Sequence, residues 1–329
     1  MSLVEVENLE VELPVDGEYK PVLRGVSFSI DTGEALGLVG ESGSGKTMTA
    51  RAIARLLPPA ARVSGRVRFD DHSILELGKS ALRSLRGQEI GMIFQDPRAA
   101  INPMRRVGAF MIEGLCDTKG VSRTDAERQA VEQLQAVRIA DPERCLRQYP
   151  HQLSGGMLQR VMIASTLMAE PRLILADEPT TALDVTTQAE VVAILDALRR
   201  ERGLSMLFIS HDLELARAVT HRTAVMYAGE IVEVQASDRL HSEPLHPYSA
   251  ALVASRPSID HTLARLPSIP GRAIPAFEAP TGCPFRPRCP HAVEVCAEKP
   301  PMTEFEDGTA AARCWRSAEL RTAQALKAG

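Results

Sequence analysis

The sequence predicts a mixed α/β fold: a mostly parallel sheet with an antiparallel β subdomain, an inserted helical subdomain and a small domain rich in proline and cysteine. Three observations predict it. Short apolar segments alternate with helical patterns up to about residue 250, a glycine-rich loop follows one such segment, and proline becomes frequent further on. Alternating strands and helices are typical of a parallel sheet, whose ligand-binding loops lie at the carboxyl ends of the strands. We expect a large domain over residues 1–250 and a smaller one over residues 251–329.

The expected strands are of two kinds. Val4–Glu12 and Val26–Ile30 alternate apolar and polar residues, as edge strands of an antiparallel sheet do. Three later segments are short, apolar and followed by polar residues, which is typical of buried parallel strands. These three are Leu36–Val39, Leu173–Ala176 and Met206–Ser210.

Two regions are expected to be helical. Gln188–Arg199 places four apolar residues at helical spacing. Ile101–Arg160 interrupts the alternation of strands and helices, and Thr124–Glu127 within it has the pattern of a capping box before an amphipathic run. We therefore expect an inserted helical subdomain over about residues 98–168.

Proline density marks the second domain. Twelve of the 22 prolines lie between Pro244 and Pro301. Proline fixes φ and removes a backbone donor, so this density disfavours long helices and central strands. Four of the six cysteines also lie in this domain, at Cys283, Cys289, Cys296 and Cys314.

Composition excludes some classes of function. The formal net charge is -4, so a broad, sequence-independent nucleic-acid surface is not expected. No apolar run approaches the roughly 18 residues that span a bilayer, and Met1–Glu5 lacks the charged and apolar regions of a signal peptide. We expect a cytoplasmic protein that, if it works at a membrane, docks on chains that cross it.

A phosphate-binding loop is predicted at Gly40–Thr47, which matches G-x-x-x-x-G-K-[ST] between a strand and a helix. Its glycines let successive backbone N–H groups point at a phosphate, and the helix that follows adds its dipole. Lys46 is expected to reach the β- and γ-phosphates of a nucleotide, and the Thr47 hydroxyl to ligate Mg²⁺. The other candidate contacts in this loop are Gly40, Ser42, Gly43, Ser44 and Gly45.

Two carboxylates follow the strand Leu173–Ala176 at the same edge of the predicted sheet. Asp177 is suited to hold Mg²⁺, generally through water, and Glu178 to polarise the attacking water. An acidic pair at a strand end is by itself more often a helix cap. The phosphate loop upstream and Pro179, which turns the chain directly afterwards, favour the catalytic interpretation.

A Ser-Gly-Gly turn is predicted to be a second phosphate-binding element. Ser154, Gly155 and Gly156 open a predicted helix, whose N-terminus attracts anions. One nucleotide site cannot use both this turn and the phosphate loop. The chain is therefore expected to supply half of a machine with two sites.

Gln95 and His211 are weak signals alone, since a histidine after a strand is usually structural. Their value comes from the order of motifs along the chain. That order resembles the nucleotide-binding subunits of ABC transporters, which are P-loop NTPases with a RecA-like core, over most of residues 1–250. The motifs are the phosphate loop, Gln95, the Ser-Gly-Gly turn, Asp177-Glu178, Ala182-Leu183-Asp184 and His211.

The resemblance implies that two such domains pack head to tail, so that ATP on Lys46 of one is closed over by Ser154 and Gly156 of the other. It also implies that the nucleotide is ATP bound with Mg²⁺. Backbone N–H groups and a helix N-terminus would again stabilise the anionic oxygens.

The same resemblance implies roles for four more side chains. Gln95 would ligate Mg²⁺, sense the γ-phosphate and signal to the membrane subunits. His211 would hold the γ-phosphate during hydrolysis, and Asp184 would cross the dimer interface. Tyr19 lies about where the family has its adenine-stacking aromatic, although a surface-loop tyrosine is an equally good interpretation.

Departures from the general pattern indicate a branch of the family. In Leu153–Arg160, Met157 stands where most of the superfamily has glutamine. This variant resembles the importers of dipeptides and oligopeptides, and nickel importers share much of the branch. Three further segments carry the same resemblance: Phe94–Pro97, His246–Tyr248 and Gly282–Pro290.

The four C-terminal cysteines are spaced Cys-x5-Cys-x6-Cys-x17-Cys. A cytoplasmic location disfavours disulfides, and structural zinc usually has a ligand pair separated by about two to four residues. Four thiolates in proline-rich loops suit an iron–sulfur cluster, and the peptide-importer branch is similar in carrying a [4Fe–4S] cluster at this motif. Zinc and no metal are the alternatives. The expected role of a metal is structural, because this short region has little core of its own.

These observations predict an ATP-hydrolysing subunit at the cytoplasmic face of the cell membrane that powers import of di- or oligopeptides. Its expected partners are a second ATPase subunit, identical or related, two membrane permease subunits and an external solute-binding protein. One alternative is the same machinery importing nickel or another small solute. A soluble ABC ATPase acting on nucleic acid or ribosomes is a second, and a metal-dependent regulator that binds ATP without turnover is a third.

Overall fold

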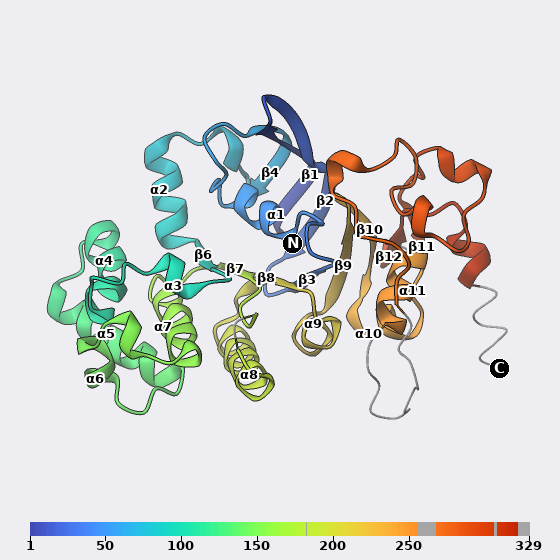
Figure 1. Ribbon diagram of the computed structural model, residues 1–329. Coiled ribbons are helices and arrows are strands. Elements are labelled where there is room, and N and C mark those ends of the chain that lie inside the picture. The colour runs from blue at the N-terminus through green and yellow to red at the C-terminus, as the bar shows by residue number, and fades with distance from the viewer. Residues whose placement is uncertain (182, 256–267, 306–307, 322–329) are drawn as a thin grey trace.

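The computed structural model describes residues 1–181, 183–255, 268–305 and 308–321. Among these residues the chain forms one sheet of eight strands and one of four. Figure 1 shows the larger sheet crossing the middle of the molecule, with the smaller sheet on one side and the helices α8 (Val185–Arg202) and α9 (Leu213–Val219) on the other. The predicted α/β class, with antiparallel and helical subdomains, is confirmed.

The eight-stranded sheet has the order β11-β12-β10-β9-β3-β8-β7-β6, and its strands from β9 to β6 are parallel. The three predicted buried strands are β3 (Ala35–Val39), β7 (Leu173–Asp177) and β8 (Ser205–Ser210). In the register Val39 pairs with Ser210 and Asp177 with Ile209, so the segments that follow all three strands begin at one edge. Their neighbours are β6 (Ile90–Ile93), β9 (Arg222–Tyr227) and β10 (Glu230–Ala236).

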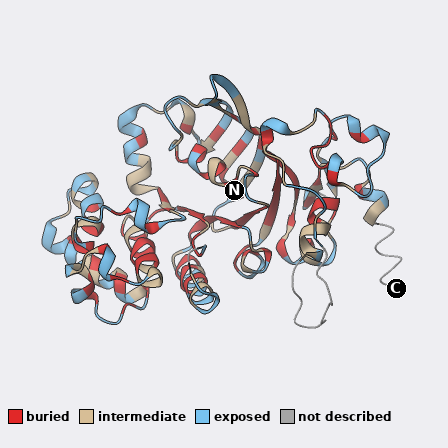
Figure 2. Ribbon diagram, viewed as in Figure 1, coloured by how far each residue is buried: buried red, intermediate tan, exposed pale blue. Residues whose placement is uncertain are grey.

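Both faces of this sheet are covered, which explains why its parallel strands are apolar at nearly every position. Leu36 and Leu38 of β3 face a core shared with the smaller sheet and α1 (Lys46–Ile53). Ala35 and Val39 face a second core, shared with α7 (Gly155–Leu167) and α8. Figure 2 shows the buried residues gathered in the strands and on the helix faces that cover them.

The smaller sheet is antiparallel and has the order β2-β1-β4-β5. Val26–Ile30 lies in the edge strand β2, as predicted. The edge prediction for Val4–Glu12 is wrong, because β4 pairs with the other side of β1 and satisfies its second row of backbone groups. The four strands are β1 (Ser2–Val15), β2 (Glu18–Asp31), β4 (Arg62–Phe69) and β5 (His72–Ser73).

The helices between β6 and β7 form the inserted subdomain at one end of the molecule (Figure 1). Thr124 is not an N-cap, contrary to the predicted capping box. Ser122 caps the helix instead, because its extended backbone lets Oγ accept a hydrogen bond from Asp125 N at 3.2 Å. With α7, the subdomain contains α3 (Pro97–Ala100), α4 (Val107–Lys119), α5 (Arg123–Ala136), α6 (Pro142–Arg147) and the 3₁₀ turn η2 (Pro150–Gln152). Before it lie η1 (Ile74–Glu76) and α2 (Lys79–Gln88).

The C-terminal region adds a short hairpin to the edge of the large sheet, where β12 (Ala310–Ala312) pairs with β10. The described part beyond residue 254 has only short elements, as its proline density predicts. The boundary near residue 250 falls within α11 and stays a prediction. The remaining elements are α10 (Ser237–Ser242), α11 (Pro247–Ala254), η3 (Ala276–Glu278), η4 (Arg286–Arg288), η5 (Glu294–Ala297) and β11 (Thr303–Phe305). Across the described ranges, no helix has both the length and the apolar character needed to cross a bilayer.

Candidate functional site

The predicted phosphate loop leaves the end of β3 and enters α1. Gly40 has φ 153° and Gly45 has φ 108°, values that residues with a side chain rarely adopt. A Cβ atom at Gly40 would lie 2.1 Å from the Met226 carbonyl oxygen, and one at Gly45 would lie 2.7 Å from Leu23 Cδ2. Both positions therefore need glycine, because the loop packs closely against β2 and β9 there.

Lys46 lies inside the curl of this loop and is 5% exposed. Its Nζ donates hydrogen bonds to the carbonyl oxygens of Gly40 at 2.9 Å and Glu41 at 3.0 Å, and lies 3.9 Å from Glu178 Oε1. Burial lowers the pKa of Lys46, while the nearby carboxylates, Glu178 first, act in the opposite direction. Ser44 Oγ is buried without a hydrogen-bond partner among the described residues, so the loop has polar capacity to offer a ligand.

Thr47 and Asp177 meet beside the loop, where Thr47 Oγ1 donates to Asp177 Oδ1 at 2.8 Å. Asp177 is 1% exposed. Burial raises its pKa, and the hydrogen bond from Thr47 opposes that shift. Hydroxyl and carboxylate oxygens are the ligands that Mg²⁺ prefers, so this pair fits the predicted magnesium site by the chemistry of its donors.

Glu178 follows β7 in a left-handed conformation, with φ 44°. For a residue with a side chain this costs about 1 to 3 kcal/mol, and the Glu178 N–H donates to the Ile209 carbonyl oxygen of β8 at 3.1 Å. Its Oε2 accepts hydrogen bonds from Gln95 Nε2 at 3.0 Å and Thr181 Oγ1 at 2.7 Å. His211 Nδ1 lies 3.4 Å from the same oxygen.

Lys46, Thr47, Glu178 and His211 line one cavity of about 410 Å³, and Asp177 lies beside it, bonded to Thr47. The predicted residues in its lining come from four separate segments, so the fold brings together motifs that span more than half of the chain. Motif order did not identify Val22, Met48 or Thr181. Thr181 lies three residues after Glu178, which is the one local signal for its contact. The lining is Val22, Ser42, Gly43, Gly45, Lys46, Thr47, Met48, Gln95, Glu178, Thr181 and His211.

The Ser-Gly-Gly turn lies in another cavity, of about 570 Å³, which shares no lining residue with the first. Ser154 is the N-cap of α7, and its Oγ accepts from Met157 N at 3.2 Å. Asp184 lines the same cavity and caps α8, accepting from Thr187 N at 3.0 Å. Ala182, which belongs to the same predicted motif, lies outside the described residues. Within one chain, the turn and the phosphate loop therefore do not form one site.

Tyr19 lies in β2 and does not line the phosphate-loop cavity. The Arg62 guanidinium carbon lies 3.5 Å from the centre of its ring. Since this cation–π contact covers one ring face, Tyr19 would have to offer its other face to an adenine. Val22, three residues further along β2, does line the cavity.

The four C-terminal thiols line one narrow cavity of about 10 Å³. Burial raises the pKa of Cys283 to about 12, and burial also raises the pKa values of Cys289 and Cys314. In the described ranges, no group of three or more His, Cys, Asp or Glu side chains is arranged to hold a metal ion. Four cysteine thiols are a donor set that fits a metal, whereas the cavity between them has room for about one water molecule. Side chains would have to move for a metal to bind.

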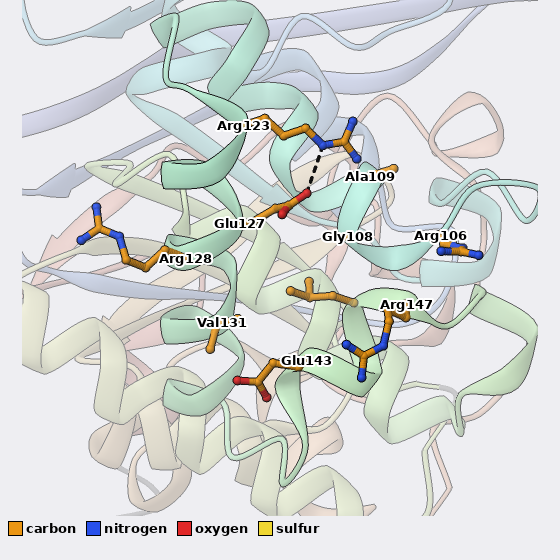
Figure 3. A pocket seen from close by; sticks show the side chains of 10 residues that line it. Arg106, Gly108, Ala109, Arg123, Glu127, Arg128, Val131, Glu143 and Arg147 are labelled. Atoms are coloured by element: carbon orange, nitrogen blue, oxygen red, sulfur yellow. Dashed lines mark hydrogen bonds and ion pairs between the residues drawn. The ribbon is translucent and has the colours of Figure 1, made fainter.

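A further cavity of about 470 Å³ lies among α4, α5 and α6, and Figure 3 shows the side chains that line it. It shares no lining residue with the three cavities described above. Its charged lining combines four arginines with two glutamates. Arg123 Nε donates to Glu127 Oε1 at 3.0 Å, and Arg128 pairs with Asp125 at the same distance. It has neither a glycine-rich loop nor an acidic strand end, so it does not share the chemistry of the predicted nucleotide site.

Comparison with known proteins gives consistent matches. Residues 23–181 match a family model described as ABC transporter, and residues 232–296 match one described as oligopeptide/dipeptide transporter, C-terminal region. The chain is 46% identical over 323 residues to the probable peptide ABC transporter ATP-binding protein y4tR of Sinorhizobium fredii, covering 97% of this chain and 96% of that protein. It is 42% identical over 318 residues to the oligopeptide transport ATP-binding protein OppD of Salmonella typhimurium, covering 96% and 94%. Among solved structures, the dimeric post-hydrolysis cassette MJ0796 bound to ADP and Pi has a TM-score of 0.64 and 29% identity, covering 71% of this chain and 98% of that one.

Proposed function

This chain belongs to the ABC transporter ATP-binding family, and from that membership we propose that it is the ATP-hydrolysing subunit of an importer for di- or oligopeptides. It is an ABC-type ATPase whose nucleotide is ATP. The observation that carries the proposal is the convergence of Lys46, Thr47 and Glu178 on one cavity beside the phosphate loop, with Asp177 hydrogen-bonded to Thr47.

The side chains around this cavity divide the work of hydrolysis. Lys46 and the loop amides bind the β- and γ-phosphates. Thr47, Asp177 and Gln95 would hold Mg²⁺, which neutralises charge on the phosphates when it is bound. Glu178 accepts a proton from the attacking water, and its strained backbone directs the carboxylate at the cavity. The remaining loop contacts are Gly40, Ser42, Gly43, Ser44 and Gly45.

His211 and Gln95 both contact the proposed base. Gln95 Nε2 lies 3.0 Å and His211 Nδ1 3.4 Å from Glu178 Oε2, so both would lie close to a γ-phosphate bound beside this carboxylate. His211 holds the γ-phosphate by hydrogen bonding. Tyr19 stays our proposed partner for adenine, with the ring face opposite Arg62 as the surface for stacking.

A second ATPase subunit completes each site. The phosphate loop and the Ser-Gly-Gly turn line separate cavities, so we propose head-to-tail packing in which Ser154, Gly155 and Gly156 of one subunit bind the γ-phosphate held by the other. Asp184, beside the turn, lies in the same dimer interface. The partner is either a second copy of this chain or a relative.

The transport partners follow from the family. We propose that residues 1–250 form the nucleotide-binding domain, with its helical subdomain over about 98–168, and that residues 251–329 form the C-terminal domain. The subunit works at the cytoplasmic face of the membrane, with two permease subunits and an external solute-binding protein. Peptide is the favoured solute because relatives at 46% and 42% identity carry peptide and oligopeptide transport names. Nickel is the alternative within the family.

Reconstitution tests the solute. The complete transporter in liposomes, with its binding protein, is expected to accumulate labelled dipeptide or oligopeptide when ATP is present on the side of the ATPase. Lys46→Ala is expected to abolish uptake. Uptake of Ni²⁺ in place of peptide would redirect the proposal, and ATPase stimulation by RNA or ribosomes with no uptake would contradict it.

We further propose that Cys283, Cys289, Cys296 and Cys314 bind an iron–sulfur cluster, with zinc as the alternative. The proposal rests on four thiols that line one cavity and on the chemistry of an all-cysteine donor set. Thiolates are the ligands, so binding must displace protons from thiols whose pKa values are raised. The role of the group is to hold together a region with few regular elements.

Anaerobically purified protein is expected to be brown and to contain about four iron atoms per chain. Cys283→Ser is expected to remove both colour and iron, whereas Cys116→Ser, in α4, is expected to keep them. Iron should be released as the pH falls, because protons compete for the thiolates. Colourless protein with one zinc per chain would contradict the cluster.

A further inference from the structure

We propose that the C-terminal region positions the phosphate-binding loop of its own chain through Glu41, and that Arg288 is the positioning residue. Glu41 is the second residue of the loop, and Arg288 belongs to the turn η4 between Cys283 and Cys289. The proposal rests on the proposed ATP site, because that loop is the part of the site on which Arg288 acts.

Arg288 and Glu41 form a two-point ion pair across 247 positions of sequence. Arg288 Nη1 donates to Glu41 Oε2 at 2.7 Å, and Nη2 donates to Oε1 at 3.1 Å. The arginine is 8% exposed, and its Nε also donates to the Pro270 carbonyl oxygen at 2.7 Å. A bidentate, buried guanidinium fixes both the position and the orientation of the carboxylate, which a surface pair does not do.

A second contact holds the backbone of the same residue. The Glu41 N–H donates to Tyr248 Oη at 2.9 Å, and Tyr248 is fully buried. Tyr248 is fixed in turn, because its N–H donates to His246 Nδ1 at 3.0 Å and the His246 N–H donates to Glu233 Oε2 at 2.7 Å. The segment His246–Tyr248, which the sequence singled out without a role, therefore forms part of the same support.

The contacts that hold Glu41 also affect Lys46, because the Glu41 carbonyl group accepts a hydrogen bond from the lysine. Lys46 Nζ donates to the Glu41 carbonyl oxygen at 3.0 Å. The Glu41 N–H points to Tyr248 rather than into the loop, so this residue anchors the loop and leaves phosphate binding to the later amides. A shift of the Glu41 peptide would move the acceptor of Lys46 and change the geometry offered to a nucleotide.

The turn that carries Arg288 is itself packed against the core. Phe285, the residue before η4, packs edge-on against the Tyr227 ring, with the ring centroids 5.4 Å apart. Arg288 Nη1 donates a hydrogen bond to Tyr227 Oη at 3.3 Å. Cys283 and Cys289 lie on either side of this segment. The cysteine region is therefore connected to the phosphate loop through the segment from Cys283 to Cys289. By reciprocity, ATP binding to the loop is expected to stabilise that segment.

ATP affinity and turnover of the full chain test the proposal. Arg288→Gln is expected to raise the Kd and KM for ATP about tenfold with kcat nearly unchanged, and Arg288→Lys is expected to recover part of the loss. Arg286→Gln, an exposed arginine of the same turn, is the matched control and is expected to bind ATP like the wild type. Glu41→Gln is expected to weaken binding similarly, and the double variant to show no additive loss.

Hydrogen exchange supplies a readout that simple destabilisation would not produce. ATP is expected to slow amide exchange over residues 283–289 in the wild type and to lose this effect in Glu41→Gln. Wild-type ATP affinity in both Arg288→Gln and Glu41→Gln would overturn the inference. If Arg288→Gln does not fold, Glu41→Gln and Arg288→Lys give the same decision. Unchanged affinity in Lys46→Ala would instead overturn the proposed ATP site, so the two failures are distinguishable.

Discussion

Replacing Glu178 with glutamine is expected to stop ATP turnover, to leave ATP binding intact and to trap a closed dimer. Removal of a general base lowers kcat by about 10²- to 10⁴-fold, because water must then be deprotonated without a positioned acceptor. The glutamine carbonyl can still accept the hydrogen bonds that Gln95 and Thr181 donate to Glu178. Binding should therefore survive while the chemical step fails.

Steady-state ATPase assays, ATP titration and gel filtration with and without ATP measure the three parts of this prediction. Glu170→Gln is the matched control: Glu170 also has a positive φ, of 54°, but is exposed and lies away from the cavity. Its turnover is expected to equal that of the wild type. Undiminished hydrolysis in Glu178→Gln would show that another group accepts the proton.

Gly156→Asp is expected to lower turnover about 10²-fold or more without weakening ATP binding by the isolated chain. A Cβ atom at Gly156 would lie 2.6 Å from Thr187 Cγ2, so either the turn or the Thr187 side chain must shift. The new carboxylate would also repel the γ-phosphate at a helix N-terminus suited to bind it. Affinity should not change, because Gly156 does not line the cavity of the phosphate loop.

Gly114→Asp provides the control for this variant. Gly114 is an exposed glycine of α4, and a Cβ atom there would meet no atom within 4 Å. It introduces the same charge in the same subdomain and is expected to leave turnover unchanged. Equal losses of ATP affinity and turnover in Gly156→Asp would mean that the turn serves the nucleotide of its own chain.

The parallel core was predictable because its strands are buried on both faces and so appear as short apolar runs. Once β3, β7 and β8 are parallel neighbours, their polar successors must meet at one edge, which is why Lys46, Glu178 and His211 converge. The position of β1 was not predictable from its own alternation, since edge and inner strands of a half-exposed antiparallel sheet show the same period.

Other features of the site left no pattern in the sequence. Glu178 combines a positive φ with a backbone hydrogen bond to Ile209 of the neighbouring strand, which is a tertiary contact. Strands of three residues, such as β12, are too short to show a period. The Arg288 and Glu41 pair joins residues 247 positions apart and has no motif of its own. Contacts between distant segments are set by packing, and one sequence carries no direct record of them.

The central claim is that the Ser-Gly-Gly turn acts on the nucleotide of a partner subunit. Mixing two inactive variants, Lys46→Ala and Gly156→Asp, tests it most directly, at a concentration where the purified wild-type chain hydrolyses ATP. In head-to-tail dimers each mixed pair has one intact site, made of one chain's Lys46 and the other chain's Gly156. Random pairing then predicts recovery of about a quarter of the wild-type rate. A mixture as inactive as its two components would contradict the account.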